Sequence, residues 1–220
     1  MELYEIMRTT FAAREFESEP IPNATLHRIL DNARFAPSGG NRQGWRVISV
    51  RDEEKRERLA QLMVPAARSY MAQCIVGENP WNTIVPTALS PEKVETAESP
   101  IAFVRTLAFA PTVLLVFVDL SVVASIDREL DRVGIVSGAS IYPFVWNILL
   151  AARSEGYGGT LTTFITLAEA EVKELFGIPE EMAVCGLIPM GKPRKQLTKL
   201  KRNPVEAFAW HDAWEGEHIA

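Results

Sequence analysis

Two short stretches rich in glycine and hydroxyl side chains are the parts of this sequence best suited to hold a ligand. They are residues 37–41 (Pro-Ser-Gly-Gly-Asn) and residues 157–164 (Tyr-Gly-Gly-Thr-Leu-Thr-Thr-Phe). Glycine lets the backbone approach a ligand without a Cβ in the way, and successive backbone N–H groups in such loops bind anions.

Basic residues cluster near both ends of the chain, Arg8 with Arg14 and Lys199 to Arg202. Guanidinium groups match phosphate oxygens bidentately, so loops and clusters together favour a phosphorylated cofactor. From the residues alone, the alternative is that both glycine-rich loops are only turns and that the basic clusters are only solvated surface charges. The phosphate loop GxxxxGK[ST] and the fingerprint GxGxxG are both absent, so neither nucleotide-binding motif is supported.

Composition excludes several classes of protein. The chain is 47% hydrophobic with a net charge of −5, which argues against disorder and, without a dominant basic block, against nucleic-acid binding. Cys74 and Cys185 form no CxxC motif, and the three histidines have no metal-ligand spacing, so we expect no metal site and no disulfide scaffold. Cys185, inside an apolar run, is expected to be inert core.

The N-terminus lacks the basic and apolar regions of a signal peptide, so we expect a cytoplasmic protein. Residues 133–152 contain no Asp, Glu, Lys or Arg and are long enough to span a bilayer. They also contain Gly134, Gly138, Pro143 and Asn147. A helix buried in the core or in a dimer interface therefore explains them better than a membrane span.

The apolar spacing predicts helices and strands in one domain covering residues 1–220. Helical periodicity follows Asn23, a candidate cap, as far as Ala36, and a strand is expected at 45–50. A second helix, capped by Asp52, is expected through Met63. Four prolines within residues 79–100 indicate a long excursion without regular elements, of the kind that forms lids or binding loops.

The second half of the chain predicts two more strands and two more helices. Residues 112–118 and 183–190 are continuous apolar runs typical of buried strands. A buried helix is expected from about Gly138 to Ser154. The capping-box pattern from Thr166 to Glu169 predicts another helix that ends at Gly177.

Four blocks of the sequence, in order, resemble the flavin-dependent nitroreductase family. They are residues 8–16, residues 20–46 with the stretch Ala-Pro-Ser-Gly-Gly-Asn-x-Gln-x-Trp, residues 138–158 and residues 188–204. The resemblance is essentially absent from residues 61–105, which we expect to form a variable lid. It implies an α+β fold with a central mixed sheet flanked by helices, and an intertwined homodimer with FMN at the interface, reduced by NADH or NADPH.

The resemblance also implies roles for individual residues. Arg14 would contact the flavin ring near N1 and the C2 carbonyl, although a surface ion pair with Glu15 or Glu17 is the alternative. Ser38, Gly39 and Asn41 would come from the other subunit and contact the ribityl chain and the phosphate. Leu161, Thr162 and Thr163 would line the ring, with a backbone N–H pointed at N5. Lys201 and Arg202 would hold the phosphate.

This sequence departs from the family pattern at several positions. The family's first arginine and its serine fall on Thr10 and Ala12, and its proline before the tryptophan is Gly44. Arg8, two residues earlier, is counted among the cofactor-binding residues as a replacement for the missing phosphate contact. Gln43 is also expected among the cofactor-binding residues, and a purely structural role for it is the alternative. Asn41 has the alternative of stabilising a left-handed loop, and Thr162 and Thr163 have the alternative of being strand residues.

The function implied is a ping-pong oxidoreductase that moves two electrons from NAD(P)H through FMN to a small electron-poor acceptor such as a nitroaromatic or a quinone. The flavin carries the chemistry, so no catalytic side chain is expected and no acid–base pair is needed. The alternatives are a flavin-binding paralogue without turnover and a same-fold reductive dehalogenase. Tyr70 and Trp81, in the variable segment, are expected mainly as lid packing.

Overall fold

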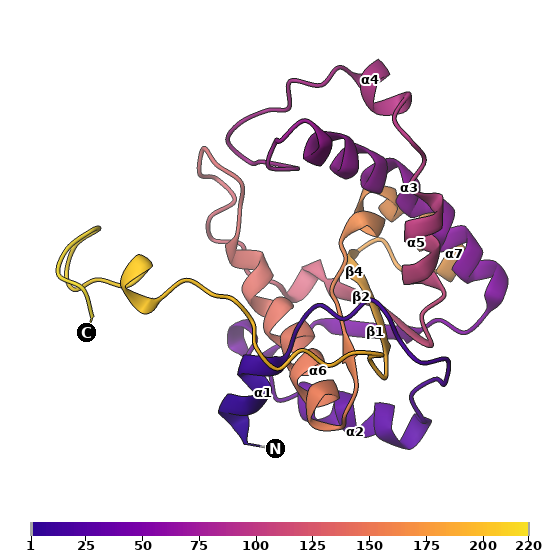
Figure 1. Cartoon of the computed structure of the whole chain (residues 1–220), viewed down its shortest axis with the longest axis horizontal. Coiled ribbons are helices and arrows are strands. Elements are labelled where there is room, and N and C mark those ends of the chain that lie inside the picture. Colours follow the sequence, from indigo (N-terminus) through magenta and orange to yellow (C-terminus); the bar gives the residue numbers. More distant parts are fainter. Residues whose placement is uncertain (1, 220) are drawn as a thin grey trace.

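The computed structural model describes residues 2–219 and has an antiparallel four-stranded sheet at its centre (Figure 1). The strand order is β1 (Trp45–Ser49), β2 (Thr112–Asp119), β4 (Met182–Gly191) and β3 (Gly158–Gly159). All three strand pairings among these residues are antiparallel, so the expectation of a mixed sheet is wrong; outside the named strands, Ala12 forms an isolated parallel bridge with Gly159. Helices and strands are combined as an α+β fold, as the sequence predicts.

The sheet centre is β2, whose side chains from Thr112 to Val118 are all buried. The run is apolar on both faces because both faces are covered by helices. Its pairing with β4 shifts register between Val116 and Phe117, where Gly186 lies opposite Val116. This bulge bends β4 next to the segment that returns along it, residues 160–163.

Helices cover both faces of the sheet. One core cluster takes Leu59 and Met63 from α3 (Glu53–Ile75), with residues from α5 (Ile101–Ala108) and α7 (Glu169–Phe176). The other takes side chains from α2 (Asn23–Ala33) and α6 (Tyr142–Ser154), and α1 (Leu3–Thr9) packs on α6. Short 3₁₀ turns connect these elements: Gly39–Asn41, Leu120–Val122, Val136–Ser140, Phe164–Ala168 and Val205–Ala207.

Helix α3 is much longer than expected. Asp52 caps it as predicted, accepting a hydrogen bond from the Lys55 N–H at 2.8 Å. The helix then continues past Met63 and through Pro65 to Ile75, because Ala66 and Ala67 extend the buried face of the helix. The predicted excursion holds one short helix, α4 (Pro91–Glu95), capped by Ser90.

Three helix starts differ from the sequence pattern. Helix α2 begins at Asn23 itself, whose side chain makes no capping bond. Helix α6 begins at Tyr142, with Pro143 in its first turn, where its missing N–H costs nothing. Helix α7 begins at Glu169, because the Glu169 carboxylate accepts from the Val184 N–H at 2.7 Å instead of closing a capping box with Thr166. Gly177, in the left-handed conformation, ends α7 as predicted.

The uncharged stretch around α6 is only partly buried. Val133, Ile135, Tyr142 and Trp146 are exposed, so one face of the stretch is not covered by any of residues 2–219. In the part of the chain that the structure describes, no helix combines the length and apolarity that crossing a membrane requires.

Residues 125–136 form a loop organised by one buried carboxylate. Asp127 accepts hydrogen bonds from the Ile135 N–H at 2.7 Å and from the Arg132 guanidinium at 2.8 Å. These bonds, the backbone one first, lower the pKa of Asp127 to about 2, so the carboxylate is charged at any ordinary pH. The loop thereby holds its apolar side chains, including Ile126 and Leu130, toward solvent.

The last residues of the chain leave the body of the molecule and end away from it (Figure 1). The departure follows several contacts with the N-terminal segment, among them a bridge between Phe16 and Pro193 and a 2.8 Å hydrogen bond from the Glu17 N–H to the Lys192 carbonyl. Trp210 and Trp214 lie against each other near the end of this segment.

Candidate functional site

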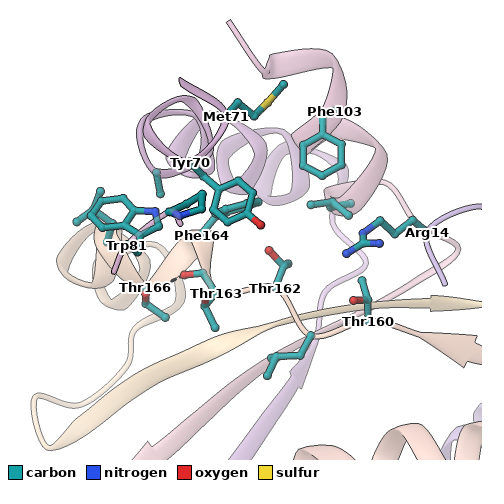
Figure 2. Close-up of a pocket in the computed structure, with 15 residues that line it drawn as sticks. Arg14, Tyr70, Met71, Trp81, Phe103, Thr160, Thr162, Thr163, Phe164 and Thr166 are labelled. Atoms are coloured by element: carbon teal, nitrogen blue, oxygen red, sulfur yellow. Dashed lines mark hydrogen bonds between the residues drawn. The ribbon is translucent and has the colours of Figure 1, made fainter. Parts of the chain in front are cut away.

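A cavity of about 840 Å³ lies between helices α3 and α5 and the chain that leaves β3, residues 160–167 (Figure 2). Its volume is in the range of small-molecule and cofactor sites. Arg14 and Trp81 lie at opposite ends of the cavity, with Tyr70 between them. The cavity thus brings together the N-terminal segment, the lid and the second glycine- and hydroxyl-rich stretch.

The floor of the cavity is the segment from Thr160 to Thr163, which runs beside β4. The Thr162 N–H donates to the Leu187 carbonyl, and the Leu187 N–H donates back to the Thr162 carbonyl, both at 2.9 Å. The Thr160 N–H donates to the Pro189 carbonyl at 3.3 Å. Because this backbone is fixed to the central sheet, the threonine side chains are presented at set positions, and Figure 2 shows Thr160 and Thr162 directed into the cavity.

Two backbone N–H groups of the floor are available to a ligand. The expected donor toward the cofactor cannot be the Thr162 N–H, which is bonded to β4. For the N–H groups of Leu161 and Thr163 no acceptor is found among residues 2–219. They flank the bonded residue and are the candidates for the predicted contact.

Arg14 enters the cavity from the N-terminal segment. Its position follows from its neighbours, since Ala12 bridges to Gly159 and the Ala13 N–H donates to the Gly159 carbonyl at 3.1 Å. Glu17, one of the alternative partners, is paired with Lys192 at 3.0 Å instead. Within the described residues Arg14 forms no ion pair, so its guanidinium is free to meet a ligand.

Aromatic side chains form the wall opposite the floor. Tyr70 from α3 and Phe103 from α5 both meet the ring of Phe164 edge to face, with centroids 5.5 and 6.4 Å apart. Trp81, from the lid, continues this wall (Figure 2). Such a surface suits a flat ring, and Tyr70 and Trp81 therefore line the cavity as well as packing the lid.

The first glycine-rich loop lies outside this cavity and is folded on itself. The Ser38 hydroxyl accepts from the Gln43 N–H at 3.0 Å, and the Gln43 amide donates to the Asn41 side chain at 3.3 Å. Asn41 and Gln43 both have a positive φ, 53° and 51°, which agrees with the left-handed alternative for Asn41. Gly39 donates its N–H to the Ser140 hydroxyl at 3.2 Å.

The remaining basic residues of the prediction also lie elsewhere in the single chain. Arg8 is exposed in the last turn of α1, while Thr10, at the family's arginine position, is buried and donates its hydroxyl to the Ile6 carbonyl at 2.8 Å. Lys201 and Arg202 are exposed in the departing C-terminal segment. One chain therefore assembles Arg14, Leu161, Thr162 and Thr163, and leaves the other predicted residues apart from them.

Sequence reasoning missed Thr160, Phe103 and Phe164 as lining residues. Phe103 follows the helical spacing of α5 and Phe164 follows the floor directly, so both have the pattern of ordinary core aromatics. Thr160 lies within the glycine- and hydroxyl-rich stretch 157–164, and the hydroxyl content of that stretch was the only sequence signal for it.

Arg14 is the one charged side chain that lines the cavity in the described part of the chain. The thiol of Cys185 is inert as expected, because burial raises its pKa to about 12 and keeps it protonated. No group of three or more His, Cys, Asp or Glu side chains suited to a metal ion occurs among residues 2–219.

Comparison with known proteins gives a consistent family match. The model of the family described as "Nitroreductase family" matches residues 7–192. An iodotyrosine deiodinase from Thermotoga neapolitana is 28% identical over 203 residues, which are 92% of this chain and 95% of that protein. An NADPH-flavin oxidoreductase from Vibrio harveyi is 26% identical over 207 residues, 92% of this chain and 70% of that protein.

Solved structures share the fold. Oxidized iodotyrosine deiodinase bound to FMN and 3-iodo-L-tyrosine superimposes with a TM-score of 0.61 at 26% identity, covering 93% of this chain and 96% of that one. NADPH:FMN oxidoreductase from Vibrio harveyi complexed with NAD+ gives a TM-score of 0.67 at 21% identity, covering 96% and 77%.

Proposed function

The chain belongs to the nitroreductase family, and from this premise we propose that it is an FMN-dependent oxidoreductase that passes two electrons from NADH or NADPH to a small electron-poor acceptor, such as a nitroaromatic or a quinone. The observation that carries the proposal is the cavity that joins an unpaired Arg14 to a fixed threonine floor and an aromatic wall. In this proposal the whole chain is one FMN-binding domain.

The residues of the cavity fit a flavin ring. The ring is flat, with an apolar dimethylbenzene end and polar atoms around the edge of its pyrimidine end, and the aromatic wall and threonine floor offer the matching surfaces. The N–H groups of Leu161 and Thr163 lack acceptors within the described residues and would donate to that edge. Arg14 would hold the N1 and C2 carbonyl side.

A bound FMN would supply the two-electron redox chemistry between NAD(P)H and the acceptor. The protein's part is binding, orientation and electrostatics. The guanidinium of Arg14 stabilises the negative charge that collects on the reduced ring. The aromatic wall would hold a flat donor or acceptor in the cavity and limit the access of water.

The phosphate and ribityl contacts are proposed to involve residues outside this cavity. Ser38, Gly39 and Asn41 would reach the cofactor from a second subunit, and Lys201 with Arg202 would hold its phosphate. Arg8 and Gln43 stay candidates for supporting contacts. Their separation from Arg14 in the single chain supports a site completed by two subunits.

We predict a homodimer in solution. The exposed apolar side chains around α6, with Ile126 and Ile135 of the Asp127 loop at 86% and 71% exposure, are too many for the surface of a monomer. Light scattering across a dilution series should give a mass of about twice 24.5 kDa. A stable monomer that keeps its flavin would contradict both the interface and the two-subunit site.

We also predict that purified protein is yellow and carries one FMN per chain. Denatured protein should release a flavin whose phosphate is intact, and NADH or NADPH should bleach the native protein in air-free buffer. Folded protein that has no flavin absorbance and takes up no added FMN would overturn the proposal. A yellow protein that neither nucleotide bleaches would indicate the alternative, a flavin-binding paralogue without turnover.

A reductive dehalogenase is the second candidate function, because the relative from Thermotoga neapolitana is named an iodotyrosine deiodinase. An amino-acid substrate carries an ammonium group at neutral pH. No carboxylate of the described chain lines the cavity, so a carboxylate that meets this group would come from the second subunit. Reduced protein that releases iodide from 3-iodo-L-tyrosine as fast as it consumes a nitroaromatic would favour this second candidate.

A further inference from the structure

Gln73 is a buried polar side chain near the end of α3, only 4% exposed, and both ends of its amide are bonded. Its Oε1 accepts from the Trp81 N–H at 3.0 Å, and its Nε2 donates to the Ser69 hydroxyl at 3.0 Å. A buried amide costs stability unless it is satisfied, so these two bonds fix its orientation. Gln73 thereby connects α3 to the lid residue that lines the cavity.

The backbone of Gln73 holds the start of the lid as well. Helix α3 ends with Gly77 in the left-handed conformation, at a φ of 79°. The Glu78 N–H donates to the Gln73 carbonyl at 3.0 Å, and the Gly77 N–H donates to the Cys74 carbonyl at 3.1 Å. This is the hydrogen-bond pattern of a Schellman motif, which sets the direction in which the chain leaves the helix. The four residues from Gly77 to Pro80 are then spanned by the side-chain bond to Trp81.

Trp81 is held in an unfavourable backbone conformation. Its φ of 55° is uncommon for a residue with a bulky side chain, and such conformations persist where surrounding contacts impose them. The indole is 52% exposed and lines the cavity at the end opposite Arg14 (Figure 2). Among the described residues, the side chain of Gln73 is the only side chain that bonds to the backbone of Trp81.

The rest of the lid is fixed by other groups. The Glu78 carboxylate accepts from the Thr87 hydroxyl at 2.6 Å and from the Ala88 N–H at 2.9 Å, and Arg68 donates to the Glu95 carbonyl at 3.1 Å. Removing the Gln73 amide would therefore free the backbone of Trp81 while the hydrogen bonds that hold the rest of the lid remain.

We infer that Gln73 is a positioning residue that holds Trp81 as the outer wall of the acceptor site, and so sets the affinity for aromatic acceptors without taking part in electron transfer. The inference rests on the proposed function, since it assigns the outer end of the cavity to the acceptor. Trp81 contacts the acceptor, and Gln73 acts through Trp81.

A matched pair of substitutions tests the inference. Gln73→Met keeps the volume of the side chain and removes its acceptor, whereas Gln73→Glu keeps an oxygen that can accept from the Trp81 N–H. In Gln73→Met, hydrogen exchange of the Trp81 amide should be about 2- to 10-fold faster, the range for loss of one hydrogen bond. The Gln73→Glu variant should keep the exchange rate of the unmodified protein.

Acceptor affinity is measured with nitrobenzene on oxidised, flavin-loaded protein without an electron donor, so that no turnover is needed. Gln73→Met should bind nitrobenzene about 3- to 10-fold more weakly, as expected for one lost aromatic contact, with flavin content unchanged. In steady state the KM for the acceptor should rise by the same factor while kcat stays constant. The Gln73→Glu variant should have the nitrobenzene affinity and the acceptor KM of the unmodified protein.

A double-mutant cycle with Trp81→Ala separates positioning from a merely structural role. If Gln73 acts through Trp81, adding Gln73→Met to Trp81→Ala should weaken nitrobenzene binding no further. Additive losses, or unchanged amide exchange in Gln73→Met, would overturn the inference. Failure of the unmodified protein to take up FMN would instead count against the proposed function, because the amide exchange of Trp81 does not depend on it.

Discussion

Replacing Arg14 with alanine is expected to lower the midpoint potential of the bound flavin by tens of millivolts and to slow its reduction by NAD(P)H. A charge-assisted contact is worth roughly 1.5–3 kcal/mol, and about 30 mV corresponds to 1.4 kcal/mol for a two-electron couple. The guanidinium has no ion pair within the described chain, so its whole charge is available to the reduced ring. Spectroelectrochemistry on flavin-saturated protein measures the shift.

The control for Arg14→Ala is Arg202→Ala. Arg202 lies in the C-terminal segment, away from the cavity, and is proposed to bind only the phosphate. Its removal should weaken FMN binding and leave the potential of the flavin that remains nearly unchanged. Equal shifts in both variants, or no shift in Arg14→Ala, would show that Arg14 does not contact the ring.

Replacing Gly186 with alanine is expected to destabilise the fold and to empty the cofactor site. Gly186 has a φ of 152°, and a Cβ there would lie 2.8 Å from the Thr162 carbonyl oxygen and 2.7 Å from Leu161 Cδ1. The new methyl group would push the floor of the cavity away from β4. Backbone strain and overpacking together should cost about 2–4 kcal/mol, measured by urea unfolding, and most of the FMN should be lost.

Gly177→Ala is the matched control for this substitution. Gly177 also has a positive φ, 65°, but a Cβ at that position would meet nothing within 4 Å. The variant should therefore lose about 1 kcal/mol from backbone strain alone and keep its flavin. A Gly186→Ala protein that is as stable as Gly177→Ala and fully loaded with FMN would refute the close contact between Gly186 and the cavity floor.

The regular elements could be predicted from the sequence where burial alone determines them. The strand around Val113 to Val118 and the strand around Val184 to Met190 are apolar on both faces, and both were found within one or two residues. The helix ends were harder, because competing partners decide them. Glu169 bonds to Val184 across the fold, and Pro65 is tolerated within α3 because tertiary packing outweighs the lost hydrogen bond.

The site could be predicted only in part for a related reason. Arg14, Thr162 and Thr163, which the resemblance implies as cofactor-binding residues, line one cavity, and their contacts with a flavin stay predictions. The lid contributes Tyr70 and Trp81 through a long helix, a Schellman motif and one buried amide, and none of these has a distinctive sequence pattern. The assignments of Ser38, Asn41 and Arg202 depend on a second subunit and stay predictions.

The contacts of the segment around Arg14 with residues far along the chain have a consequence for biosynthesis. Arg14 is synthesised well before the partners of its segment, which is anchored to Gly159 and, through Glu17, to Lys192 just after β4. At about 5–20 residues per second, the N-terminal segment waits roughly ten seconds to half a minute for these partners to be synthesised. The cavity is therefore completed only after β4 has been synthesised, and a chain truncated before β4 would have the lid helix and the floor residues 160–163 but no strand to fix that floor.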